Sequence, residues 1–292
     1  MANTVSQRDV FFADARDPGT DVGGLISTPT ITNAVFHTIV AIAIGRDGAT
    51  FYIQTENGET LARNAHIIRP GRYLVQSDEP VAATSRPFFT RALSSSAATR
   101  LDSFRQEVRM RDQGCVITKM PSIYGPRDDN WIPFQAAHVL PIAYANEWRS
   151  QGFARLITIP PPPPHHNDTI NSVQNGFLMR SDIHQLFDSY HFSILPSAGH
   201  TFVFFKPDFY GLGGTGLERR LLDDPRRPPD ELLEWHFEQA VLYNVRGGGE
   251  PSQEFDFPPG SDMVGEILAG PKAIERMEFE LFTRLGPGDD ET

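Results

Sequence analysis

The side chains best suited to chemistry in this sequence gather between Gln135 and Asp188. His184 and Asp188 stand four residues apart, so on a helix both side chains point to one face, one turn apart. An imidazole and a carboxylate at that spacing suit two ligands on one metal ion. Ser181 and Asp182 precede them and are good N-cap residues, which supports a helix at this place.

Two stretches upstream of this helix complete a three-part pattern. Residues 135–141 read QAAHVLP and contain His138, residues 175–180 read NGFLMR and begin with Asn175, and residues 182–188 read DIHQLFD. Hydrolysis of a phosphodiester needs a cation that neutralises developing charge and a base that deprotonates water near neutral pH. The pattern offers residue types for both tasks.

In order and spacing the pattern resembles the HNH nuclease motif, with His138, Asn175 and His184 as its signature residues. The resemblance implies a ββα-metal fold, in which a two-stranded ribbon holds the base and the following helix holds the metal. It implies His138 as general base, Asn175 as the amide that pins the loop backbone, and His184 with Asp188 as ligands. It further implies an endonuclease that acts on nucleic acid with one divalent ion, either Mg²⁺, Mn²⁺, Ni²⁺ or Zn²⁺.

The wider chain is similar to a group of fungal HNH-domain proteins. These have a β-rich N-terminal extension and C-terminal segments like those at residues 236–251 and 256–262. The similarity covers nearly all of the chain, although only residues 111–194 bear the nuclease-like motifs.

The motif departs from the family pattern at two positions. The residue before the base is often a metal ligand in the family, but here it is Ala137, which cannot coordinate a metal. Gln135 stands where relatives can carry Glu, and a neutral amide is a poor ligand for a hard cation. Mg²⁺ accepts many water ligands, whereas Zn²⁺ prefers a third nitrogen or sulfur. The candidates for that third ligand are the remaining nearby histidines: His165, His166 and His191.

The charge of the chain is uneven. Overall it carries 26 basic and 37 acidic residues, a net charge of −11. Residues 229–292 hold 4 basic and 15 acidic residues, which leaves 22 of each in residues 1–228. The body is therefore neutral, which weakens the electrostatic argument against nucleic acid without creating one for it. The basic helix expected at residues 101–113 is either a solvated amphipathic helix or a phosphate-contacting one; its cationic residues are Arg105, Arg109 and Arg111, with Arg100 just before it.

The expected fold class is α+β, with a β-rich N-terminal region, a central ββα-metal HNH motif and a helical C-terminal region. Residues 1–85 are expected to form a small antiparallel sheet with strands near residues 35–44, 50–54 and 72–75, followed by a linker at 86–98. Residues 99–200 are expected to form the HNH core, with residues 160–164, five prolines, in an exposed loop. Residues 201–292 are expected to be mostly helical and acidic and to pack on that core, with helices beginning near residue 229 and covering 274–285.

Cellular location follows from what the sequence lacks. The chain has one cysteine, no run of about 18 apolar residues and no signal-peptide pattern. An intracellular protein of the cytoplasm or nucleus, with no membrane partner, is therefore expected.

Two alternative functions compete with an endonuclease. The first is an HNH frame used for acid/base chemistry on a small molecule in fungal secondary metabolism, because a fold does not fix a function. The second is a non-catalytic binding module or a module that self-associates into a homo-oligomer, which the acidic C-terminal helices suggest.

Overall fold

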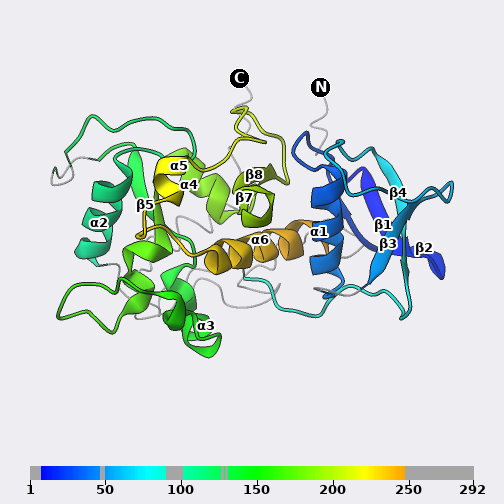
Figure 1. Ribbon diagram of the computed structural model, residues 1–292, viewed down its shortest axis with the longest axis horizontal. Helices are drawn as coiled ribbons and strands as arrows, with labels where there is room; N and C mark the ends of the chain where they lie inside the picture. The colour runs from blue at the N-terminus through cyan, green and yellow to red at the C-terminus, as the bar shows by residue number, and fades with distance from the viewer. Residues whose placement is uncertain (1–7, 47–49, 90–100, 126–127, 129–130, 247–292) are drawn as a thin grey trace, which may run out of the picture.

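The computed structural model describes residues 8–46, 50–89, 101–125, 128 and 131–246, and Figure 1 shows their arrangement. Helices and strands are mixed along the chain, as expected of an α+β protein. The predicted helix at residues 274–285 lies outside the described residues. Within them, no helix is both long and apolar enough to cross a membrane.

The N-terminal region is a four-stranded sheet with one helix against it (Figure 1). The sheet is mixed rather than purely antiparallel as predicted, because its two central strands, β1 and β4, run parallel. A parallel pair needs a long connection, and the chain between these strands supplies it with two further strands and a helix. In chain order the elements are β1 (Val10–Asp14), β2 (Asp17–Leu25), α1 (Asn33–Ala43), β3 (Phe51–Thr55) and β4 (Gly71–Ser77).

The prediction of a strand at residues 35–44 is wrong, because α1 occupies this stretch. Its β-branched residues suggested a strand, yet Val35, Phe36, Ile39 and Val40 recur at helical spacing and are all buried. The side chain of Thr32 accepts a hydrogen bond from the backbone N–H of Val35 and caps the helix. Burial of one helical face outweighs the weak local preference for a strand.

The central region contains the predicted ribbon and helix. Helix α2 (Asp102–Asp112) precedes strand β5 (Phe134–His138), which pairs antiparallel with β6 (Gly176–Arg180), and α4 (Ser181–Asp188) follows β6 directly. Between β5 and β6 lie the short helix α3 (Ala145–Ser150), several 3₁₀ turns and the loop that contains the five prolines, which is exposed over residues 162–167. The ββα arrangement expected from the motif is thus present in the structure.

The last described elements are a two-stranded hairpin and two helices. Strands β7 (Phe192–Leu195) and β8 (Thr201–Phe204) form a hairpin, α5 (Arg219–Leu222) is one turn long, and α6 (Asp230–Val245) is the predicted C-terminal helix. The expected boundary at residue 200 falls inside this hairpin.

Helix α6 lies between the two halves of the molecule (Figure 1). Leu232, Leu233 and Trp235 belong to the apolar core around the ribbon, whereas Phe237 and Val241 belong to the core of the N-terminal sheet. A helix that is apolar on nearly every side is one that is surrounded by protein. The C-terminal helix therefore joins both cores.

A buried ion pair anchors α2 to the ribbon. The side chains of Arg111 and Asp112 are both fully buried and contact each other through two hydrogen bonds of 2.6 and 2.8 Å. The remaining N–H groups of Arg111 donate to three backbone carbonyls, those of Val173, Gly176 and Arg226. All five guanidinium donors are thereby used.

Arg111→Met is expected to lower the free energy of unfolding by about 3–5 kcal/mol, because it leaves the Asp112 carboxylate buried without its cation. Arg105→Met is the matched control on the same helix, since Arg105 pairs with exposed Asp102 and should contribute less than about 1 kcal/mol. Urea unfolding of both variants measures the difference. Equal midpoints for the two variants would contradict this account.

One buried histidine on α6 makes stability depend on pH. His236 stacks on Phe187 with ring centroids 3.7 Å apart, and Ser193 Oγ lies 2.8 Å from its Nδ1. Complete burial lowers the pKa of His236 to about 3, although the charge of Asp188 opposes the shift. Between pH 6.5 and about pH 3, the imidazole of His236 is protonated in the unfolded chain but neutral in the folded chain.

His236→Phe is therefore expected to lose a pH dependence that the wild type has. Below pH 6.5 the wild type should lose up to about 1.4 kcal/mol of unfolding free energy per pH unit more than the variant does. Urea midpoints at pH 7, 5.5 and 4.5 measure both slopes. His166→Phe, on the exposed loop, should keep the wild-type slope; parallel slopes for wild type and His236→Phe would show that His236 titrates normally.

Candidate active site

The candidate site is built on the β5–β6 ribbon and the helix that follows it. His138 is the last residue of β5 and lies opposite Gly176, the first residue of β6. Asn175 comes one position before β6, and His184 and Asp188 lie on α4. The structure thus brings the predicted residues to one ribbon-and-helix unit.

His138 is buried against α2. Its ring stacks on Phe104 with centroids 3.8 Å apart and planes 10° from parallel, and only 4 % of the residue is exposed. A Cβ at position 176 would collide with the Phe104 ring, so a glycine opposite His138 leaves room for this stack. Phe104 therefore fixes the plane of the imidazole.

Asn175 holds the chain that follows His138. Its fully buried side chain accepts a hydrogen bond from Leu140 N at 2.9 Å and donates to Leu140 O and Ile170 O. Its backbone carbonyl also accepts from Val139 N. The amide thus fixes the two residues after His138, as the resemblance implies.

His184 lies between two polar side chains. Its Nδ1 is 2.6 Å from Oε1 of Gln135, and its Nε2 is 3.0 Å from Oδ2 of Asp188. The side chains of His184 and Asp188 are only 5 % and 8 % exposed, whereas Gln135 is exposed. The helical spacing places imidazole and carboxylate together, as predicted from the sequence.

The two parts of the site project from the ribbon in different directions. Side chains alternate along a strand, so Gln135 and Ala137 share one face and His138 lies on the other. Gln135 reaches His184 on α4, while His138 reaches Phe104 on α2. Ala137 therefore stands on the His184 side, where a ligand at that position would have joined the pair.

The His184–Asp188 pair fits two ligands of one octahedral ion. Ligands at right angles on an ion about 2.1 Å away lie about 3 Å apart, which agrees with the 3.0 Å between Nε2 and Oδ2. Waters and a substrate phosphate would have to supply the other ligands. A zinc site with three protein ligands does not fit, since the described residues contain no group of three metal-binding side chains.

The histidines considered as a third ligand do not join the site. His165 and His166 are exposed on the proline loop. His191 is partly buried, and its Nδ1 lies 3.1 Å from Ser189 Oγ. Burial, followed by the nearby charge of Lys206, lowers the pKa of His191. The described part of the chain contains no group of three metal-binding side chains, so the structure does not bring any of these histidines to His184 and Asp188.

The arginines of α2 do not act as one basic face. Arg111 is buried, which contradicts its expected place on a solvated or phosphate-contacting surface. Arg105 pairs with Asp102. The guanidinium of Arg109 lies 4.9 Å above the ring of Trp131, beside an open depression that Gln135 and Ser181 also line.

Sequence reasoning missed three residues that support the site. In the sequence Phe104 is only one of the apolar residues of the helix expected at residues 101–113, and Arg111 is only one of its cationic residues. Gln135 was judged only as a weak ligand, although the structure makes it the partner of His184. The sequence signal for this role of Gln135 was its position two residues before Ala137, which places both side chains on one face of a strand.

Comparison with known proteins identifies the central segment. Residues 115–195 match the family model described as HNH endonuclease. The central segment carries an HNH nuclease domain. Residues 7–82 match a second model, described as a domain of unknown function (DUF8573), and no curated protein or solved structure matches the chain. The HNH match begins after α2, so Phe104 and Arg111 are supplied from outside it.

Asn175→Ala is expected to free the loop after His138, because Leu140 loses a donor and an acceptor that are buried. The loss should lower the free energy of unfolding by about 2–4 kcal/mol and speed hydrogen exchange at the Leu140 amide. Asn146→Ala, at an exposed position on α3, is the control. Unchanged exchange at Leu140 in Asn175→Ala would contradict the pinning role.

Proposed function

We propose that the HNH domain is a metal-dependent endonuclease that hydrolyses phosphodiester bonds in nucleic acid. The observation that supports this most directly is the hydrogen-bonded geometry of Asn175, which fixes the chain after His138 at the end of a ββα unit. The family match over residues 115–195 supports a nuclease-type function in general.

In this proposal His138 is the general base that takes a proton from the attacking water. Asn175 is a positioning residue, because it acts through the backbone at Val139 and Leu140. His184 and Asp188 would hold the ion, through Nε2 and a carboxylate oxygen. A bound divalent ion would neutralise charge on the phosphate and the leaving oxygen.

The overall charge of the protein would contribute little to its affinity for nucleic acid. Residues 1–228 carry no net charge, so their long-range attraction to nucleic acid is weak. Affinity for nucleic acid should then depend on a few local cations. Arg109 is one such cation near the ribbon, beside the depression that contains Gln135.

A second candidate function is a binding module that does not cleave nucleic acid. The stacking of His138 beneath Phe104 favours it, because a base must reach the water that it deprotonates. Ala137 favours it as well, since it removes one expected ligand.

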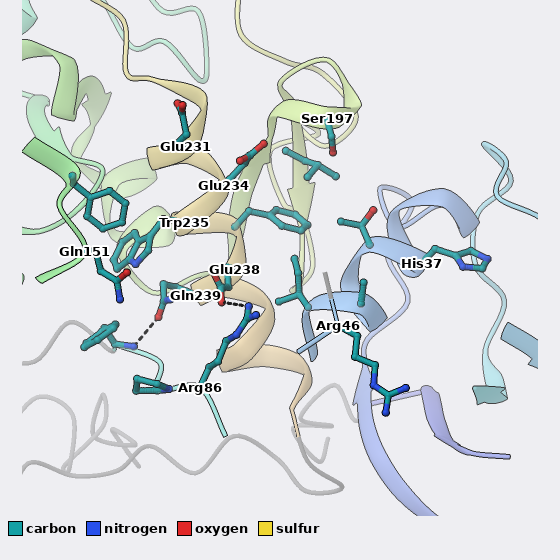
Figure 2. A pocket seen from close by; sticks show the side chains of 18 of the residues that line it. His37, Arg46, Arg86, Gln151, Ser197, Glu231, Glu234, Trp235, Glu238 and Gln239 are labelled. Atoms are coloured by element: carbon teal, nitrogen blue, oxygen red, sulfur yellow. Dashed lines mark hydrogen bonds and ion pairs between the residues drawn. The ribbon is translucent and has the colours of Figure 1, made fainter. Parts of the chain in front are cut away.

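Acid/base chemistry on a small molecule at His138 has less support. A cavity of about 1040 Å³ beside α6, seen in Figure 2, lies between α1, α3 and α6, and none of the motif residues line it. It is lined by apolar side chains and by both signs of charge, including the ion pair of Arg86 with Glu238 at 2.9 Å. An enzyme of this kind would need a deep apolar pocket at His138 to hold its substrate, and this cavity lies elsewhere.

Cleavage of supercoiled plasmid and of a labelled single strand tests the proposal, with Mg²⁺, Mn²⁺, Ni²⁺ or Zn²⁺ supplied in turn. The wild type should cleave with an octahedral ion, and His138→Ala should slow cleavage by about 10²–10⁴-fold, because it removes the base. His166→Ala, on the exposed loop, should cleave at the wild-type rate.

Cleavage that is equally fast in folded His138→Ala would contradict the assignment of the base. Binding of the strand without cleavage under any of the four ions would favour the binding module instead.

A further inference from the structure

Gln135 is exposed to solvent, yet its side chain reaches a buried imidazole. Gln135 is on strand β5, and its Oε1 lies 2.6 Å from Nδ1 of His184 on helix α4. On the other side of the ring, Nε2 lies 3.0 Å from the carboxylate of Asp188. The imidazole is thus held at both nitrogens.

The chemistry of the amide decides where the proton of the ring lies. An amide oxygen only accepts hydrogen bonds, so Nδ1 of His184 must donate to Gln135. In the neutral imidazole the proton is then on Nδ1, and Nε2 carries a lone pair. Oδ2 of Asp188 lies 3.0 Å from Nε2, outside hydrogen-bond geometry, and also carries lone pairs.

Two lone-pair atoms 3.0 Å apart in a buried place attract a cation between or beside them. Their separation matches two adjacent ligands of one ion, as described above for the candidate site. In the opposite tautomer Nε2 would carry the proton and would no longer be available to a metal.

We propose that Gln135 is a positioning residue that fixes the Nδ1–H tautomer of His184 and so keeps Nε2 available for a divalent cation. The metal part of this inference rests on the proposed function, since it takes His184 and Asp188 as the ligands. The tautomer is a property of the protein alone. Gln135 touches neither substrate nor ion and acts through His184.

The amide also sets the charge of the site. A glutamate at position 135 would accept the same Nδ1 proton but add a negative charge close to the imidazole, which strengthens it as a ligand. With glutamine, Asp188 is the charged member of the group of three. Gln135 therefore orients His184 while keeping the local charge low.

The tautomer is tested in the metal-free protein by nitrogen NMR of the His184 ring. The wild type should show the proton on Nδ1, Gln135→Leu should move it to Nε2, and Gln135→Glu should keep it on Nδ1. Gln185→Leu is the matched control on α4, because the Gln185 side chain is exposed. The hydrogen bond from Ser189 Oγ goes to the backbone carbonyl of Gln185, which the substitution leaves in place.

Calorimetric titration with Mn²⁺ tests the consequence for the cation. Gln135→Leu should weaken binding by about 10–100-fold, the usual effect of losing the outer partner of a ligating histidine. Gln135→Glu should bind Mn²⁺ at least as tightly as the wild type, and Gln185→Leu should match it.

An Nε2–H tautomer in the wild type would overturn the proposal, and so would an unchanged tautomer or Mn²⁺ affinity in Gln135→Leu. Neither measurement uses nucleic acid. A protein that never cleaves DNA but shows the expected tautomer and Mn²⁺ affinities would contradict the endonuclease and leave the role of Gln135 intact.

Discussion

The buried Arg111–Asp112 pair is the interaction on which the geometry of the site depends. Arg111 binds the carbonyls of Val173 and Gly176, one on each side of Asn175, while Asp112 accepts from Leu178 N in β6. A guanidinium with all its donors used in a fully buried place tolerates little displacement. The helix that carries this pair also carries the aromatic ring that covers His138. One helix outside the family match therefore holds both His138 and the segment that contains Asn175.

The site itself divides into two halves that meet at one strand. On one face of β5, an aromatic ring holds an imidazole in place by stacking, and on the other, an amide and a carboxylate hold a second imidazole by polar contacts. The two halves use different physical forces, so Ala137 on the His184 side leaves the stacked histidine undisturbed. If His184 and Asp188 bind an ion as proposed, two protein ligands suit an ion that retains water better than one that requires a protein cage.

The sequence was a good guide where chemistry depends on local spacing. The i, i+4 relation of His184 and Asp188 and the long C-terminal helix follow from the chain itself, and the structure has them. The expected N-cap at Ser181 or Asp182 is wrong: both are helical residues of α4, and its N-cap is Arg180, which makes no side-chain cap hydrogen bond. The sequence was a poor guide where long-range packing decides. The β-branched run at residues 35–44 became a helix because one of its faces is buried, and the parallel pairing of β1 with β4 has no local signal. Adjacent opposite charges in a helix look solvated in a sequence, so the burial of Arg111 could not be foreseen either.

The position of helix α6 decides which fragments of the protein keep a complete apolar core. Its residues complete the apolar core of the HNH half and that of the N-terminal sheet at the same time. A fragment cut to residues 115–195 would expose the surface that Leu232 and Trp235 cover and would lack the helix that holds the ribbon. A stable form of the HNH unit is therefore expected to include both α2 and α6. Because α6 also belongs to the core of the N-terminal sheet, unfolding of either half should destabilise the other.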